Sequence, residues 1–127
     1  MPLTRIALRA GKSDEYRKAL TESIQRSLVD TFNVPKDDIF MLLTEHSASN
    51  FVYDHQYLNV QRSDELVMIQ ITLNNTRTLE QKKALYERMA NELAESPGLR
   101  REDVLINLVE VLKENWSFGN GIAQYAL

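Results

Sequence analysis

Hydrophobic and polar residues alternate near the beginning of the chain and again beyond its middle. Residues 4–9 and 67–73 both follow this pattern, and the buried set in each is expected to be Thr4, Ile6 and Leu8, then Val67, Ile69, Ile71 and Leu73. A period of two predicts a strand with one buried face. Two later runs, 39–43 and 104–109, are almost continuously apolar, which is typical of strands covered on both faces.

A spacing of four residues follows each alternating segment and predicts an amphipathic helix. The apolar positions are Tyr16, Leu20, Ile24 and Leu28 in the first helix and Leu85, Met89 and Leu93 in the second. Ser13 is a suitable N-cap for the first helix. Thr78 and Gln81 have the spacing of a capping box, and Pro97-Gly98 should end the second helix. Each half of the chain therefore reads as strand, helix, strand.

The two halves are copies of one another. With a shift of 65 residues, LTRIALRAGKS (3–13) lies over MIQITLNNTRT (68–78), and DDIFMLLTE (37–45) lies over EDVLINLVE (102–110), without a gap. The repeat divides a single domain, 1–127, into halves at about 2–45 and 67–110. Residues 46–66 are inserted between the halves, and 111–127 form a tail.

A strand, a helix and a second strand make a right-handed parallel unit. Two such units related by a pseudo-twofold axis give an α+β fold, with a four-stranded mixed sheet and both helices on one face. The other face of this sheet is apolar, and a monomer rarely exposes so large a patch. We therefore expect the chain to assemble with copies of itself.

Composition excludes several classes of function. A net charge of -3 and a pI of about 5.4 offer no basic surface for nucleic acid, and the strands lack the aromatic residues of an RNA-binding sheet. No apolar run has the length of a membrane span and no signal peptide is visible, so we expect a cytoplasmic protein. The chain has no cysteine and 2 histidines, which excludes thiol chemistry and predicts neither a metal nor another cofactor.

Pro2 is the first candidate for chemistry. Once Met1 is removed, the ring nitrogen of Pro2 becomes a secondary amine at the start of a strand, suited to act as a general acid, a general base or a nucleophile. A retained Met1 would leave that nitrogen in an amide. The second half has Val67 at the equivalent position, and an internal residue has no free amine. Only the first half can keep this chemistry, unless Pro2 is simply a chance proline.

Two charged residues are further candidates. Arg77 immediately precedes the expected N-cap of the second helix, where a guanidinium and the helix amides together would bind a carboxylate. The alternative is a solvated surface arginine, and Lys12 is its counterpart in the repeat. Asp38 stands just before a predicted strand. Because Asp103 repeats it, a structural role is as good an interpretation as a carboxylate that orients water or stabilises a protonated amine.

The tail contains Trp116 and Phe118 ahead of two glycines, in the segment ENWSFGNG. The two aromatic side chains are suited to line a pocket and exclude water from it. Packing in the core or at an interface is the commoner use of aromatic residues and is the alternative here.

Taken together, Pro2, the repeat, the segment NNTRTLEQKKALY (74–86) and the tail ENWSFGNGIAQY (114–125) resemble the malonate semialdehyde decarboxylase-like branch of the tautomerase superfamily. The resemblance covers essentially the whole chain. It implies a β-α-β fold, a homotrimer with sites near subunit boundaries, and no cofactor. It also implies roles in the site: Pro2 is the catalytic amine, Asp38 the carboxylate beside it, and Arg77 the group that binds a substrate carboxylate. Trp116 and Phe118 form an apolar wall, and Asn115 lies at the edge of the site.

One departure concerns the arginines. A well-known type of this decarboxylase has two closely spaced arginines at the start of the second helix, whereas this chain has Arg77 alone in Asn74-Asn75-Thr76-Arg77, as a second type does.

The function implied is decarboxylation, or hydration, of a small 3-oxo acid like malonate semialdehyde, with Pro2 protonated. A keto–enol tautomerase of 2-oxo acids, with Pro2 neutral, is the alternative among enzymes. A cytokine-like, non-catalytic interaction protein is the alternative of another class.

Overall fold

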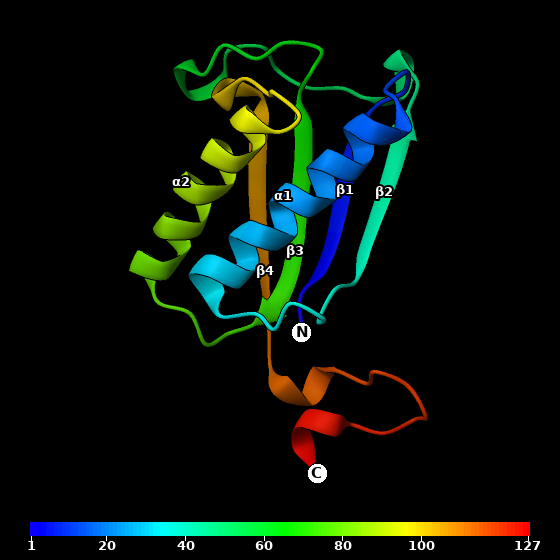
Figure 1. Cartoon of the computed structure of the whole chain (residues 1–127), viewed down its shortest axis with the longest axis vertical. Helices are drawn as coiled ribbons and strands as arrows, with labels where there is room; N and C mark the ends of the chain where they lie inside the picture. Colours follow the sequence, from blue (N-terminus) through cyan, green and yellow to red (C-terminus); the bar gives the residue numbers. More distant parts are fainter.

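The computed structural model describes residues 1–127, and its fold is the predicted one. In chain order the elements are β1 (Leu3–Arg9), α1 (Asp14–Phe32), β2 (Met41–His46), β3 (Val67–Asn74), α2 (Leu79–Glu95) and β4 (Val104–Val111). Short 3-10 turns lie in the segment between β2 and β3 and in the tail. Figure 1 shows a single sheet with both helices on one side of it.

The sheet has the strand order β2-β1-β3-β4. Strands β1 and β2 pair in parallel, as do β3 and β4, and the central strands β1 and β3 pair antiparallel. The central register carries the internal symmetry, because the pair Leu3–Thr72 becomes the pair Met68–Ala7 when the repeat shift is applied. The two halves are thus related by a pseudo-twofold axis through the middle of the sheet.

The core lies between the sheet and the helices, and it contains the residues that the two periodicities select. The buried set includes Ile6, Leu8, Leu20, Ile24, Leu28, Val67, Ile69, Ile71, Leu73, Leu85, Met89 and Leu93. The predicted caps are also confirmed. Ser13 Oγ accepts a hydrogen bond from the Tyr16 amide at 3.1 Å, and Thr78 and Gln81 form a capping box at the start of α2. Each helix is therefore fixed at its N-terminus by its own sequence.

The predicted closing strands need two corrections. The strand expected at 39–43 begins only at Met41, and Ile39 and Phe40 remain outside it, each about half exposed. A turn in which the Asp38 amide donates to Pro35 O at 3.0 Å precedes them and delays the strand. In addition, Leu42 and Leu105 are exposed, so in one chain the closing strands are covered on one face only.

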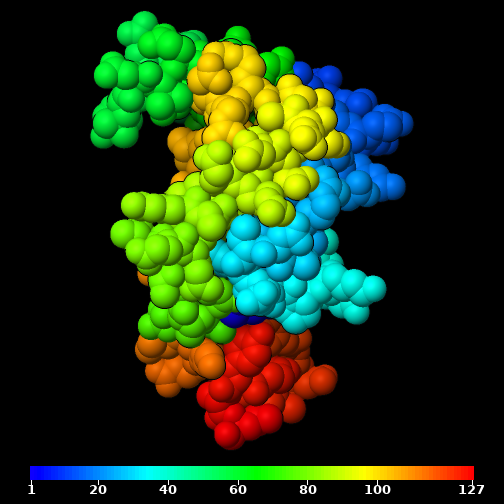
Figure 2. Space-filling view, turned by 60° about the vertical axis from the view of Figure 1, so that its left-hand side comes forward, coloured from blue at the N-terminus to red at the C-terminus, as the bar shows by residue number.

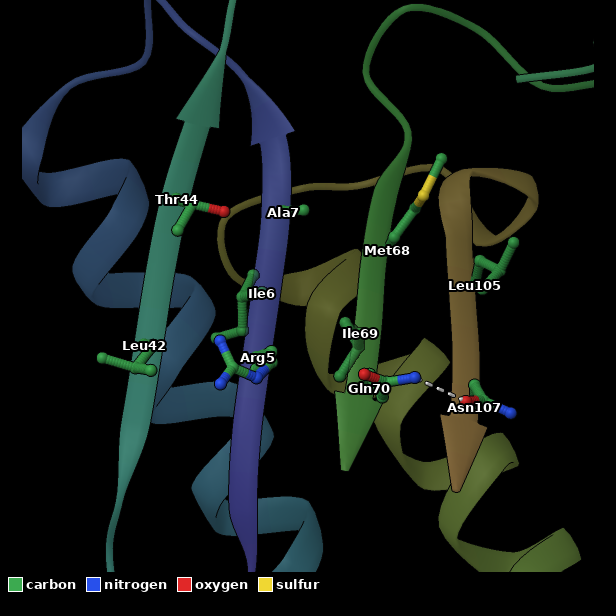
Figure 3. A pocket seen from close by; sticks show the side chains of 10 residues that line it. All are labelled: Arg5, Ile6, Ala7, Leu42, Thr44, Met68, Ile69, Gln70, Leu105 and Asn107. Carbon is green, nitrogen blue, oxygen red and sulfur yellow. Dashed lines mark hydrogen bonds between the residues drawn. The ribbon is translucent and has the colours of Figure 1, made fainter. Parts of the chain in front are cut away.

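The uncovered face of the sheet is hollowed at its centre. Figure 3 shows the side chains of this open face, where Gln70 Nε2 donates to Asn107 Oδ1 at 3.0 Å. They border a concavity of about 350 Å³, where apolar side chains such as Leu42, Met68 and Leu105 lie beside polar ones, whereas Ile6 and Ile69 are buried in the core. No helix in the structure combines the length and apolar character that crossing a bilayer requires.

Candidate active site

The N-terminus, the segment between α1 and β2, and the tail meet at one end of the sheet. Strand β1 begins at this end, and β3 ends there because it runs antiparallel to β1. The tail therefore lies below the N-terminus in Figure 1, and Figure 2 shows it packed as a lobe against this end of the molecule. Pro2, Asp38, Arg77 and Trp116 all lie in segments that converge here.

Asp38 faces the terminal amine. The ammonium group of Met1 donates to Asp38 Oδ2, and the Asp38 side chain is only 17% exposed. Pro2 follows directly and is buried. In the presence of Met1 the nitrogen of Pro2 belongs to an amide, so the amine that meets Asp38 is that of Met1. The arrangement can stabilise a positive charge at the chain terminus.

Arg77 joins the end of α1 to the beginning of α2. Its Nη2 donates to Phe32 O at 2.5 Å, its Nη1 donates to Thr76 Oγ1 at 2.7 Å, and its guanidinium lies 5.0 Å from the centre of the Phe32 ring. Burial lowers the pKa of Arg77 from its ordinary value. A guanidinium has five N–H donors, and no carboxylate forms an ion pair with this one. Arg77 therefore has a structural role at the α1 C-terminus, and it keeps donors free for an anion.

The aromatic residues of the tail wall a cavity beside β1. The Trp116 and Phe118 rings stack with their centres 5.2 Å apart, and Phe118 packs against Phe40 at 6.1 Å. Trp116 Nε1 donates to Asn74 Oδ1 at 2.7 Å, which fixes the tail to the end of β3. A cavity of about 220 Å³ is lined by these rings together with Leu3 and Ser117.

Two predicted residues lie at this end of the sheet but form no hydrogen bond with the other predicted residues. Asn115 is exposed, and its side chain makes no hydrogen bond within the chain. Arg77 forms no hydrogen bond or ion pair with Pro2 or Asp38 and does not line the aromatic cavity. No cluster of three His, Asp or Glu side chains is arranged to hold a metal ion.

Sequence reasoning missed Phe40, Asn74 and Tyr125. Tyr125 packs edge-on against Phe118 at 5.1 Å, and burial together with the charge of Asp38 raises its pKa. Phe40 belongs to the apolar run 39–43, which predicts a strand and gives no sign of a role in a cavity. Tyr125 stands within the conspicuous aromatic tail, which was the available signal for it.

The repeat counterparts of Asp38 and Arg77 are Asp103 and Lys12, which lie at the opposite end of the sheet. There they bind other residues of the same chain. Asp103 is fully buried and accepts hydrogen bonds from the Ser63 amide at 2.7 Å and the Ser63 hydroxyl at 2.6 Å. Lys12 forms an ion pair with Glu65. Of the two aspartates that the repeat made equivalent, Asp103 is structural, and Asp38 is the one that meets an amine.

The sequence matches two family models, both described as tautomerase enzyme, over residues 38–119 and 2–60. The chain belongs to the tautomerase superfamily. It is 45% identical to the probable tautomerase YusQ of Bacillus subtilis (strain 168), over 98% of each chain.

Two solved structures extend this comparison. The FG41 malonate semialdehyde decarboxylase, inhibited by 3-bromopropiolate, is 34% identical with a TM-score of 0.91, over 97% of this chain and 93% of that one. A fused 4-OT, a symmetric trimer, is 21% identical with a TM-score of 0.79, over 98% of each chain, and shows the shared fold. This tautomerase-superfamily chain therefore combines the family's fold with the amine, carboxylate and aromatic cavity at one end of its sheet.

Proposed function

We propose that this tautomerase-superfamily protein is an enzyme that decarboxylates, or hydrates, a small 3-oxo acid such as malonate semialdehyde, using the nitrogen of Pro2 after Met1 is removed. The observation that best supports this is the position of Asp38 at the chain terminus, where its carboxylate accepts a hydrogen bond from the ammonium of Met1, the residue next to Pro2. A carboxylate in that place favours a protonated amine, which decarboxylation and hydration require. Similarity to malonate semialdehyde decarboxylase over nearly the whole chain supports the same substrate class.

In the proposed reaction the free donors of Arg77 bind the substrate carboxylate, and the Pro2 ammonium donates a hydrogen bond to the carbonyl oxygen. The bond between the carboxylate carbon and the neighbouring carbon breaks and carbon dioxide leaves. The electron pair passes into an enolate, whose oxygen the ammonium stabilises, and a proton from water then yields acetaldehyde. Donors fixed in advance where charge develops usually give the largest catalytic effect. The stacked Trp116 and Phe118 rings keep water away and strengthen the electrostatic interaction.

A keto–enol tautomerase is the second candidate, since the curated relative is named a probable tautomerase. That reaction needs a neutral Pro2 as the general base. The two candidates therefore differ in the protonation state of one nitrogen at neutral pH, and titration of a nitrogen-labelled Pro2 by NMR separates them.

Decarboxylation of malonate semialdehyde by the wild type and by Pro2→Ala tests the proposal, after an intact mass has established that Met1 is absent. We expect acetaldehyde formation by the wild type and a rate about a hundredfold lower for the variant, because a primary amine without the ring is poorly positioned. We also expect 3-bromopropiolate to inhibit the wild type. A processed protein without decarboxylase activity would contradict the assignment and favour the tautomerase.

We further propose that the open face of the sheet is the subunit interface of a homotrimer. The face presents the apolar side chains of Leu42, Met68 and Leu105 beside polar ones, and burial of exposed apolar surface is the usual reason for stable association. The fused 4-OT neighbour is itself a trimer.

Substitution on this face tests the assembly. Leu105→Asp is expected to dissociate the trimer in sedimentation experiments, because it places a charge within the apolar interface. Tyr86→Asp is the matched control, since Tyr86 is 37% exposed and Leu105 is 38% exposed, but Tyr86 lies on α2, away from the sheet face. A wild type that sediments as a monomer would refute the assembly.

A further inference from the structure

Gln25 makes a contact that the proposed reaction does not yet use. It lies in α1 and is only 9% exposed. Its Nε2 donates to two main-chain oxygens of the segment between α1 and β2, Asp38 O at 3.2 Å and Lys36 O at 3.4 Å. An amide buried in a helix thus holds the turn that carries Asp38.

This turn occurs twice in the chain. In the first half the Asp38 amide donates to Pro35 O, and in the second half the Asp103 amide donates to Arg100 O, both at 3.0 Å. The preceding residues also match, because Val34 N donates to Leu28 O and Leu99 N donates to Leu93 O. The same backbone structure therefore presents both aspartates.

The two copies of the turn are held in place by different means. In the second half the carboxylate of Asp103 is itself the anchor, since the amide and hydroxyl of Ser63 and a guanidinium nitrogen of Arg100 all donate to it. The repeat counterpart of Gln25 is Ala90, which has no amide side chain. In the first half the side chain of Gln25 binds main-chain oxygens of the turn instead. The carboxylate of Asp38 therefore remains available to the terminal amine.

We propose that Gln25 is a positioning residue of the active site: by binding the carbonyls of Lys36 and Asp38 it fixes the Asp38 carboxylate against the terminal amine. This inference rests on the proposed function for its catalytic consequence. A carboxylate that must face a reacting amine is not free to anchor its own loop, so the anchor has to come from elsewhere. An amide with two N–H donors meets this need with no added charge next to the ammonium.

Gln25→Met tests the proposal, because methionine keeps the length of the side chain and removes both donors. We expect kcat to fall about tenfold with little change in KM, because a small displacement of a catalytic group has a large effect on rate. The pKa of the Pro2 amine should fall as the carboxylate moves away. The pKa of Tyr125 is raised by burial and by the charge of Asp38, so Tyr125 is followed in the same titration.

A double-substitution cycle distinguishes positioning from a purely structural role. If Gln25 acts through Asp38, Gln25→Met should no longer change the amine pKa when Asp38→Asn is already present. Ser27→Ala is the matched control, since it removes a buried hydrogen bond to Ser23 O in the same helix without touching the turn, and it should leave the amine pKa unchanged.

An unchanged amine pKa in Gln25→Met, with a loss of stability like that of Ser27→Ala, would overturn the proposal. Gln25→Leu, which also removes both donors and adds no charge, is the second variant should methionine prevent folding, and failure of both variants to fold would assign Gln25 to the core alone. The amine titration needs no substrate. It therefore decides the role of Gln25 even if the decarboxylase assignment fails.

Discussion

Replacing Arg77 with alanine is expected to lower kcat/KM for malonate semialdehyde about a thousandfold, which corresponds to about 4 kcal/mol of transition-state stabilisation. The guanidinium has no carboxylate partner within the chain, and burial makes its interaction with an anion stronger than at the open surface. Steady-state kinetics of the purified variant measure the effect.

A structural effect accompanies the loss of Arg77 and has to be separated from it. Alanine removes the hydrogen bond to Phe32 O, which we expect to lower the free energy of unfolding by about 1 kcal/mol. Lys12→Ala is the matched control, because Lys12 is the repeat counterpart of Arg77 and binds Glu65 at the opposite end of the sheet. Equal activities of the Arg77→Ala and Lys12→Ala variants would show that Arg77 has no role in substrate binding.

Asp103→Ala and Asp38→Ala are expected to have opposite effects, although the two residues are equivalent in the repeat. Asp103→Ala should lower the free energy of unfolding by about 3 kcal/mol, because it removes a fully buried carboxylate that accepts hydrogen bonds from the amide and hydroxyl of Ser63. Asp38→Ala should change stability by only about 1 kcal/mol, since its carboxylate has a single partner, the terminal amine, and does not anchor its own turn, yet it should abolish most of the activity.

Urea denaturation and decarboxylase assays on the same two variants measure both effects. The wild type gives the reference for each. A loss of stability of similar size in both variants would mean that Asp38 is structural, as its repeat counterpart is. Full activity in Asp38→Ala would likewise exclude Asp38 from the reaction.

The fold was predictable because the internal repeat contains the same pattern of strand, helix and strand twice. The alternation in β1 recurs in β3, the helical spacing of α1 recurs in α2, and Ser13 and Thr78 mark both helix starts. Each copy confirms the element assigned in the other. The error at the start of β2 came from Ile39 and Phe40, which are apolar but lie outside the strand, Ile39 beside α1 and Phe40 against Phe118 at the aromatic cavity.

The candidate site was predictable only in part. Repetition makes Asp38 and Asp103 indistinguishable in sequence, and what separates them is Ser63, which lies in the inserted segment outside the repeat. The hydrogen bond from Arg77 to Phe32 O joins two helix ends that are 45 residues apart, and no local pattern signals it. The contacts of Gln25 are equally invisible in the sequence, because its partners are main-chain oxygens, which every residue possesses.

The internal repeat also sets a stoichiometry. A chain that contains two copies of one unit has a single amino terminus, so an assembly of any number of these chains has twice as many units as terminal amines. Half of the positions equivalent to Pro2 therefore have no terminal amine to present. Val67, which occupies the place of Pro2 and is fully buried, is an example of what such a position becomes. Each chain can therefore present one terminal amine at one end of its sheet, whereas at the other end the equivalent position is part of the core.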